Sequence, residues 1–258
     1  KILRKGEKWG KKTRILLHFL LRAVVFTRGW RRGKIFSRLP LLRYDAEGIS
    51  SSQNRWMSLL LSNDVGRNYD CNFENNFANT GGAIYSKANS TIVSDSNFTS
   101  NNATSGGAIY GIGNNLAVTN CGFSTDNATN GGAIYVKGDG LEVADSTFSE
   151  NYASSSGSAI YIEGNSNSIS GSNFTSNEAG AYSAIYIEGN SNSISFCNFT
   201  ENIAFFDAGA VYLEGDDSTI TDSYFSSNNG YDGGAVKIIG EEATIANSVF
   251  EDNYAGTE

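Results

Sequence analysis

A short motif recurs along this chain at a fixed interval, and that interval constrains the fold more than any other feature. The pentapeptide GGAIY occupies residues 81–85, 106–110 and 131–135. Three positions of the surrounding unit stay in register at steps of 25 or 26 residues. They are an alanine (Ala83, Ala108, Ala133, Ala159, Ala184, Ala210, Ala235), a phenylalanine (Phe73, Phe98, Phe123, Phe148, Phe174, Phe199, Phe225, Phe250) and, three residues after each phenylalanine, an asparagine or aspartate (Asn76, Asn101, Asp126, Asn151, Asn177, Asn202, Asn228, Asn253). A period of this length indicates a stack of repeated structural units.

Each unit alternates apolar and polar residues and therefore predicts short β-strands. Ile134 and Val136 share one parity, whereas Tyr135 and Lys137 share the other, which is the period of a strand with one buried face. A second aliphatic residue lies five positions before the phenylalanine, from the second copy onward, and marks another strand. Gly, Asn, Ser and Asp fill the positions between strands, as is typical of turns.

A unit of about 25 residues with two or three short strands is too small to bury its own apolar face, so it must stack on its neighbours. Strands of successive coils then pair in parallel about 4.8 Å apart, and parallel crossover connections are almost always right-handed. We predict an all-β fold, a right-handed parallel β-helix over residues 68–258. This single-stranded solenoid would have about seven coils of 25 residues.

The three cysteines test this stacking scheme. Cys71, Cys121 and Cys197 each lie two residues before a repeat phenylalanine, where the other coils have serine. They are two and three coils apart, about 10 and 14 Å at the spacing of paired strands. A disulfide requires Cα atoms within about 7 Å. We predict three free, buried thiols.

Residues 1–67 share nothing with the repeats. They carry 16 Lys and Arg against 4 Asp and Glu, whereas residues 68–258 carry 3 Lys, no Arg and 23 Asp and Glu. A basic stretch precedes an apolar run at 15–26 that is too short to span a bilayer. The segment fits a degenerate secretory signal or anchor, a basic amphipathic helix on a membrane or capping the rod, or a disordered leader.

We therefore expect a domain boundary between residues 67 and 68, and membrane contact only through residues 1–67. The apolar residues at 58–61 offer a way to close the open end of the first coil, which would otherwise expose strand edges. The acidic surface of the repeats repels phosphate backbones, so we expect no nucleic-acid binding. The chain begins at Lys1 and stops within a unit after Phe250, which fits a fragment of a longer protein.

A column of aromatic residues is the first candidate binding site. A tyrosine follows the motif isoleucine or valine in six successive coils: Tyr85, Tyr110, Tyr135, Tyr161, Tyr186 and Tyr212. By parity these rings face away from the isoleucine core. Stacking between rings of adjacent strands stabilises a sheet. The same column also suggests a flat platform for sugar rings or for a partner protein, and the two interpretations do not exclude each other.

Glu163, Glu188 and Glu214 follow at equivalent positions of three successive coils, so their carboxylates are expected to stack about 5 Å apart. Three interpretations remain open: a solvated outer face that prevents lateral sheet pairing, a weak Ca²⁺ ladder, or a carboxylate pair of a retaining glycosidase. The asparagine column is expected to be structural, because stacked amides hydrogen-bond from coil to coil. Asp126 interrupts that column.

Catalysis is the weaker interpretation of this chain. Polysaccharide lyases and hydrolases on β-helices need clustered acids with a Lys, Arg or His partner. The one histidine, His18, lies outside the repeats, and Lys87, Lys137 and Lys237 lie in separate coils. We expect a non-catalytic binding or structural module without a cofactor. The alternative is a β-helix carbohydrate-active enzyme.

The pair of motifs GGAI and FxxN resembles the repeat of the chlamydial polymorphic outer membrane protein family. Phrases such as SNFTSNNATSGGAIY at 96–110 are also similar to Asn-rich adhesin-like surface proteins of methanogenic archaea. The resemblance covers residues 73–258 and implies a cell-surface or secreted right-handed β-helix used in adhesion. The partner it implies is a glycan or a surface protein of a host or neighbouring cell. Within these 258 residues we expect neither the C-terminal membrane barrel of autotransporters nor a typical signal peptide.

Overall fold

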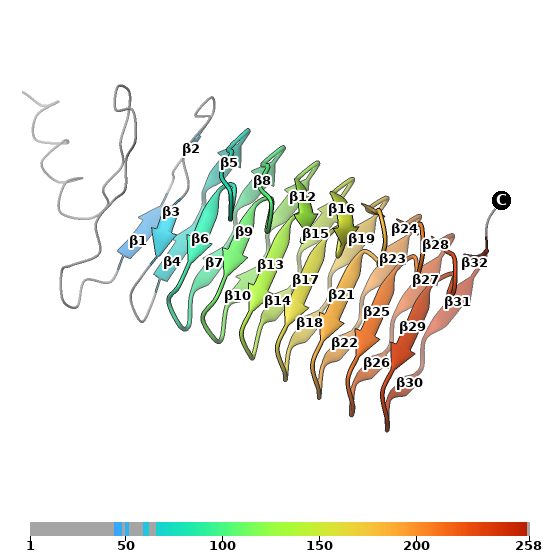
Figure 1. Cartoon of the computed structure of the whole chain (residues 1–258). Coiled ribbons are helices and arrows are strands. Elements are labelled where there is room, and N and C mark those ends of the chain that lie inside the picture. The colour runs from blue at the N-terminus through green and yellow to red at the C-terminus, as the bar shows by residue number, and fades with distance from the viewer. Residues whose placement is uncertain (1–43, 48–49, 52–58, 62–65, 257–258) are drawn as a thin grey trace, which may run out of the picture.

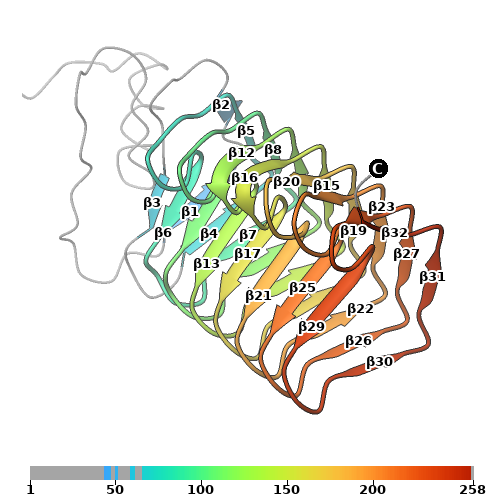
Figure 2. The ribbon, with the colours of Figure 1, turned by 45° about the vertical axis from the view of Figure 1, so that its right-hand side comes forward.

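The protein folds as a right-handed parallel β-solenoid of about eight turns, as the repeat predicts (Figure 1). A computed structural model describes residues 44–47, 50–51, 59–61 and 66–256. Successive coils lie one behind the other and form a rod (Figure 2). The described residues contain strands and turns but no helix, so none of them forms a helix of the length and apolarity that a membrane span requires.

Four parallel sheets run along the rod, and each coil contributes one short strand to most of them. Sheet A contains β1 (Tyr44–Glu47), β4 (Gly66–Tyr69), β7 (Ile92–Ser94), β10 (Ala117–Thr119), β14 (Glu142–Ala144), β18 (Ser168–Ser170), β22 (Ser193–Ser195), β26 (Thr219–Thr221) and β30 (Thr244–Ala246). Sheet B contains β2 (Ser50–Ser51), β5 (Asn72–Glu74), β8 (Asn97–Thr99), β11 (Gly122–Ser124), β15 (Thr147–Ser149), β19 (Asn173–Thr175), β23 (Asn198–Thr200), β27 (Tyr224–Ser226) and β31 (Val249–Glu251).

The GGAIY motif and its tail form sheet C, which contains β3 (Leu59–Leu61), β6 (Ile84–Ser86), β9 (Ile109–Gly111), β13 (Ile134–Lys137), β17 (Ile160–Glu163), β21 (Ile185–Glu188), β25 (Val211–Glu214) and β29 (Val236–Ile239). A smaller sheet D precedes the motif in each coil and contains β12 (Asn127–Asn130), β16 (Tyr152–Ser156), β20 (Glu178–Ala179), β24 (Ile203–Ala204), β28 (Asn229–Gly230) and β32 (Tyr254–Ala255).

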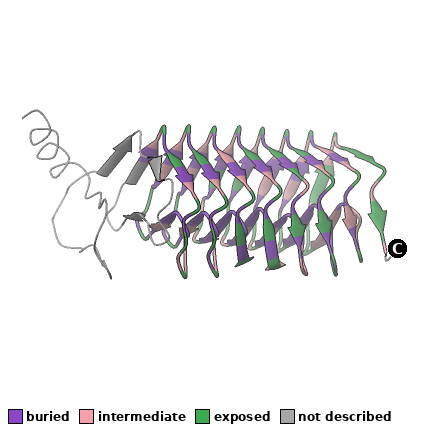
Figure 3. Cartoon of the chain, turned by 90° about the horizontal axis from the view of Figure 1, so that it is seen from above, coloured by how far each residue is buried: buried purple, intermediate pink, exposed green. Residues whose placement is uncertain are grey.

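Each repeat position stacks on its equivalent in the next coil. Ile134 pairs with Ile109 on one side and with Ile160 on the other, and all three are fully buried. Because a strand alternates its side chains between two faces, this register keeps the apolar residues inside along the rod as far as the last coil (Figure 3). In that coil Ile245 and Phe250 are 45% and 46% exposed. The predicted columns of aliphatic residues are confirmed.

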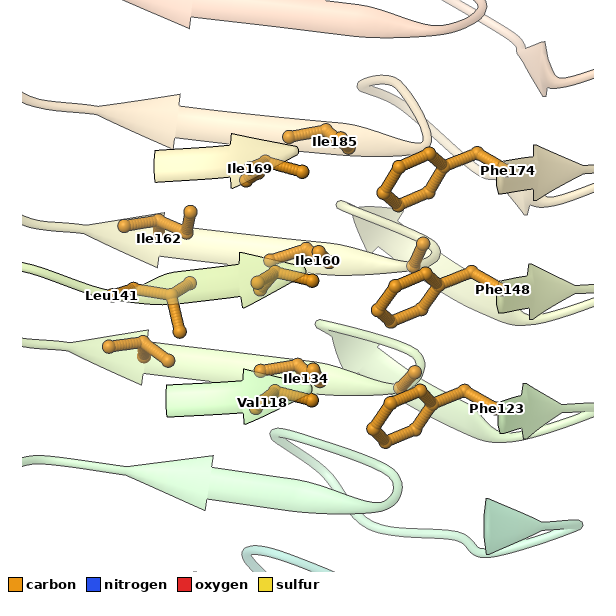
Figure 4. Close-up of a cluster of buried hydrophobic side chains, with 14 of the residues drawn as sticks. Val118, Phe123, Ile134, Leu141, Phe148, Ile160, Ile162, Ile169, Phe174 and Ile185 are labelled. Atoms are coloured by element: carbon orange, nitrogen blue, oxygen red, sulfur yellow. The ribbon is translucent and has the colours of Figure 1, made fainter. Parts of the chain in front are cut away.

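The repeat phenylalanines form a continuous stack in the core (Figure 4). Ring centroids of successive members from Phe73 to Phe250 lie 4.6–4.9 Å apart, with interplanar angles of 2–7°. The aliphatic columns pack beside these rings. Each stacked pair adds about 0.5–1.5 kcal/mol beyond the burial of its apolar area, so the stack stabilises contacts between coils rather than within one.

The first glycine of the motif sits at a corner that excludes a side chain. Gly81 has φ +58°, and a Cβ atom there would lie 2.1 Å from the carbonyl oxygen of Ile84. The second glycine, Gly82, faces the next coil, where a Cβ atom would lie 2.1 Å from the carbonyl oxygen of Gly107. The paired glycines therefore permit both the tight bend and the close approach of coils.

Leu59–Leu61 pairs in parallel with Ile84–Ser86 and adds an eighth strand to sheet C, before the first motif copy. Tyr44–Glu47 likewise pairs with Gly66–Tyr69. The predicted boundary at residues 67 and 68 stays a prediction. The interpretations of the apolar run at 15–26, and of His18, concern residues outside those that the structure describes.

Cys71, Cys121 and Cys197 are free and buried, as predicted. Burial raises the pKa of the Cys121 thiol to about 11, and the same cause raises the pKa of Cys197 to about 11. Serine fills this position elsewhere because its hydroxyl bonds locally. Ser96 Oγ donates to the carbonyl oxygen of Ser94 at 2.7 Å and accepts the backbone N–H of Cys71 at 3.1 Å.

Candidate functional site

The predicted tyrosine column lies on the outward side of sheet C. Its six rings come from adjacent strands, and β-pairing places each beside the next. Successive ring centroids from Tyr85 to Tyr212 lie 4.7–5.3 Å apart, with interplanar angles of 7–23°. The structure therefore brings all six predicted residues together in one stack.

The stack covers the faces of its own rings. Each interior tyrosine has a ring on both sides, so what it presents outward is an edge and a phenol hydroxyl. Tyr135 and Tyr212 are only 5% and 6% exposed, and the other four are half-buried. The column offers a row of ring edges and hydroxyls rather than the flat platform of ring faces that a sugar would stack on.

Carboxylates and lysines border this row of hydroxyls. Glu163 accepts a hydrogen bond from the Tyr135 hydroxyl and pairs with Lys137 Nζ at 2.9 Å. Tyr186 donates to Glu214 at 3.3 Å. Lys137 Nζ also lies 5.6 Å from the centroid of the Tyr135 ring, a distance at which the ring face attracts a cation. The face therefore combines phenol donors with fixed carboxylate acceptors.

Burial and the neighbouring carboxylates keep these phenols protonated. Burial raises the pKa of Tyr161 to about 12, and the charges of Glu163, Glu188 and Glu214 add to the shift. Burial likewise raises the pKa of Tyr135, and its hydrogen bond to Glu163 contributes. A deprotonated phenol would be desolvated and close to like charges, so the neutral form is favoured. The column presents hydrogen-bond donors at neutral pH.

The three stacked glutamates do pair across strands, Glu163 with Glu188 and Glu188 with Glu214. Glu163 and Glu214 are engaged by the lysine and tyrosine contacts of this face. Within the described ranges, no three Asp, Glu, Cys or His side chains group as ligands of a metal ion. Glu163 and Glu214 thus hold tyrosines and a lysine, and the Ca²⁺ and glycosidase interpretations of the three glutamates stay predictions.

Comparison with known proteins identifies the repeat unit. Residues 70–87 and 145–163 match the repeat described as the Chlamydia polymorphic membrane protein repeat. Both segments begin three residues before a core phenylalanine and end three residues after the Ala-Ile of the motif. These two segments of the solenoid therefore fit a repeat of the polymorphic membrane protein type. No curated protein and no solved structure matches the chain, so the similarity to archaeal adhesin-like proteins stays an expectation.

The polymorphic membrane protein-type unit carries its asparagine inside the rod. Asn177 is fully buried, and its Nδ2 donates to Asn202 Oδ1 at 2.9 Å and to the carbonyl oxygen of Phe148 at 3.0 Å. Its Oδ1 accepts the backbone N–H of Asn151 at 3.1 Å. Most members of the column repeat these contacts. The column is structural, as the sequence predicts.

Sequence reasoning did not predict the contacts that flank the tyrosines. Tyr182 packs edge-on against Tyr186 and Tyr212, with centroids 5.5 and 5.2 Å apart. Lys237 ends the column and pairs with Asp207 and with Asp232, the latter at 2.7 Å. Tyr182 stands where most other coils have the first motif glycine, and Lys237 stands at the next tyrosine position of the column. The repeat therefore predicts where these residues lie but not which side chains they contact. The available signal was the 26-residue step before Ala210, which marks an extra residue beside Asp207.

Proposed function

We propose that this chain is a non-catalytic, adhesin-like module of a cell-surface or secreted protein. The observation that carries the proposal is the polymorphic membrane protein-type repeat on a rod whose outward side chains stay in register over about eight turns. Such a rod presents one extended face, which suits binding to a surface-bound partner. The partner is a glycan or a surface protein of a host or neighbouring cell.

The outward side of sheet C supports a binding role. Its tyrosines are held on paired strands, and the carboxylates of Glu163 and Glu214 fix the hydroxyls of Tyr135 and Tyr186. Side chains that are already ordered lose little conformational entropy when a partner binds. The row of phenol hydroxyls and carboxylates suits hydrogen bonding to hydroxyl or amide groups.

The charged residues of the repeats support a non-catalytic role. Lys87 and Lys137 lie over Tyr85 and Tyr135, and Lys237 lies over Tyr212 in ion pairs with two aspartates. Each repeat lysine is thus committed to a ring. General acid–base catalysis works best with a group whose pKa lies near the operating pH, whereas hydrogen bonds to carboxylates raise the pKa of Lys137 and of Lys237.

Adhesion of protein-coated beads tests the proposal. Beads carrying the full chain should adhere to cultured epithelial cells or to microbial cells above the level of albumin-coated beads. The double substitution Tyr135→Ala with Tyr161→Ala should abolish adhesion while the circular dichroism spectrum stays β-rich. Tyr152→Ala is the matched control, because Tyr152 lies on sheet D and is 37% exposed. Equal adhesion of the double variant and the parent would reject the tyrosine face as the site.

Incubation with acidic and neutral polysaccharides tests the absence of catalysis. We expect no new reducing or unsaturated ends. Reproducible cleavage that Glu188→Gln abolishes would overturn the non-catalytic assignment.

A further inference from the structure

Three aromatic side chains stand outside every stack of the rod. Phe205, Phe206 and Tyr231 are 57%, 66% and 52% exposed. They lie in the corners that lead from β24 to β25 and from β28 to β29 (Figure 1). Among the described residues none of the three has an aromatic stacking partner, unlike the rings of the tyrosine and phenylalanine columns. We call these three residues the aromatic corner.

The corner arises where the repeat departs from its pattern. Four residues before the motif alanine, the earlier coils have small side chains or polar residues (Asn79, Thr104, Thr129, Ser155, Gly180), and only the last two have Phe206 and Tyr231. Ala204 pairs with Ala179 and Val211 pairs with Ile185. Six residues lie between Ala204 and Val211, whereas five lie between Ala179 and Ile185 in the preceding coil. The corner that holds both phenylalanines therefore contains one extra residue.

The backbone of the corner is held in place by the adjacent coils. The N–H groups of Phe205 and Phe206 donate to the carbonyl oxygens of Ala179 and Ala181 at 3.3 and 3.2 Å. Ala208 and Gly233 form a parallel bridge between the two coils, which sets Phe206 and Tyr231 one coil apart. The rings are therefore presented from an ordered backbone, which lowers the entropic cost of binding.

An ion-pair network around Lys237 links the same two corners. Asp207 follows Phe206, Asp232 follows Tyr231, and Lys237 Nζ bonds to both carboxylates. Asp207 is nearly buried, with 9% of its side chain exposed, whereas the side chain of Asp232 is 48% exposed. Lys237 therefore links the two corners that carry the rings, and the Asp232 carboxylate, next to Tyr231 in the chain, stays partly accessible.

The chemistry of the corner favours an uncharged carbohydrate. Open aromatic faces attract the C–H faces of sugar rings, and carboxylate oxygens accept hydrogen bonds from sugar hydroxyls. A second copy of this chain is a poor occupant, since residues 68–258 carry 23 acids against 3 lysines and two such surfaces repel each other. The negative electrostatic potential of the repeats also disfavours the binding of anionic polymers.

We propose that Phe205, Phe206 and Tyr231 form a stacking site for an uncharged oligosaccharide, with Asp232 as a hydroxyl acceptor. The site adjoins the Lys237 end of the tyrosine column but uses none of the rings of that column, whose faces are covered. It deepens the binding role proposed above by naming a ligand class, and in that sense rests on it.

Calorimetric titration of the full chain tests this site. The probes are neutral hexasaccharides of glucose, mannose, xylose and N-acetylglucosamine, with a hyaluronan hexasaccharide as the anionic arm. At least one neutral probe should bind saturably, and hyaluronan should not. Phe206→Ala with Tyr231→Ala should weaken that binding at least tenfold. Phe196→Ala is the matched control, because Phe196 lies in the same coil, is 67% exposed and is remote in the coil from the corner.

Each result decides the proposal. Absence of saturable binding to every neutral probe, stronger binding of hyaluronan, or equal losses in the corner and Phe196 variants would overturn it. So would concentration-dependent dimerisation in sedimentation that the corner variant abolishes, because the rings would then serve self-association. Bead adhesion separates the two proposals. If the corner variant loses sugar binding but still adheres, the aromatic corner is supported as a sugar site that bead adhesion does not need. If the parent chain adheres but binds no sugar, only the general adhesion role is retained.

Discussion

Asn101 donates two hydrogen bonds to one oxygen of Asp126. Its backbone N–H lies 2.7 Å from Asp126 Oδ1 and its Nδ2 lies 2.9 Å from the same atom. Asp126 Oδ2 is buried and has no hydrogen-bond partner. At this place the other coils have an amide Nδ2, which donates to the asparagine of the next coil and to a phenylalanine carbonyl. A carboxylate in this position meets acceptors, and only its protonated form can donate there.

Asp126→Asn should therefore stabilise the protein, and by more as the pH rises. Burial raises the pKa of Asp126 to about 8, above the ordinary value of about 3.9 for an aspartate. The folded state then binds more protons than the unfolded state between these values, so the parent loses stability as pH rises from about 4 to about 8. The variant should be about equal at pH 4 and more stable by about 2–5 kcal/mol at pH 8.5. Urea unfolding across this range checks it, and a pH-independent difference would contradict the assignment.

Phe196 is strained and exposed, and its replacement should stabilise the rod. It has φ +53° at a corner where the other coils have Asp, Asn or Gly (Asp70, Asp95, Asn120, Asp145, Gly171, Asp222, Asn247). Left-handed backbone costs an ordinary L-residue about 1–2 kcal/mol, and Asn or Asp less. Phe196→Asn should gain about 1 kcal/mol of unfolding free energy, measured in urea. The reciprocal change Gly171→Phe should lose a similar amount, and a destabilised Phe196→Asn would show that the ring packs after all.

Truncation within the phenylalanine stack should be strongly destabilising. Phe148 is 1% exposed and stacks on Phe123 and Phe174 at 4.8 Å. Phe148→Ala removes both contacts and leaves a cavity, so about 3–5 kcal/mol of unfolding free energy should be lost. Tyr152→Ala, outside the core, should cost less than about 1 kcal/mol. Thermal or urea unfolding compares the two, and equal losses would contradict a core built on this column.

The three thiols should react only when the protein unfolds. Cys121 and Cys197 are buried, and burial raises the pKa of both to about 11, so little thiolate forms at pH 8. The thiolate is the nucleophile in disulfide exchange. A chromogenic disulfide reagent at pH 8 should detect three thiols in denaturant and react slowly with the native protein. Rapid labelling of a native thiol would show that a coil opens or is misplaced.

The repeated positions made the scaffold predictable. Ile109, Ile134 and Ile160 recur at one step with period-two neighbours, and that combination permits only strands that stack in parallel. The asparagine column and the isolated cysteines follow from the same translation. Leu59–Leu61 was harder, because no motif marks this strand; it joins sheet C through backbone pairing and position alone.

The binding features depend on packing that the repeat pattern does not specify. Parity predicts that Tyr135 points outward, yet stacking by Tyr110 and Tyr161 decides that only its edge and hydroxyl are presented. The 26-residue steps before Ala159 and Ala210 show that two coils are longer by one residue. Which residue bulges outward depends on where Ala204 and Val211 pair, and that information lies in the packing rather than in the sequence pattern.

Distances between spin labels along one outward column test the stacking of coils most directly. Thr99, Thr200, Ser226 and Glu251 lie in one register of sheet B. In a background with the three cysteines changed to serine, labels at 99/200, 99/226 and 99/251 should lie about 19, 24 and 29 Å apart, a rise of about 5 Å for each added coil. Distances that fail to increase by this constant step, or that shorten as the sequence separation grows, would contradict the parallel solenoid.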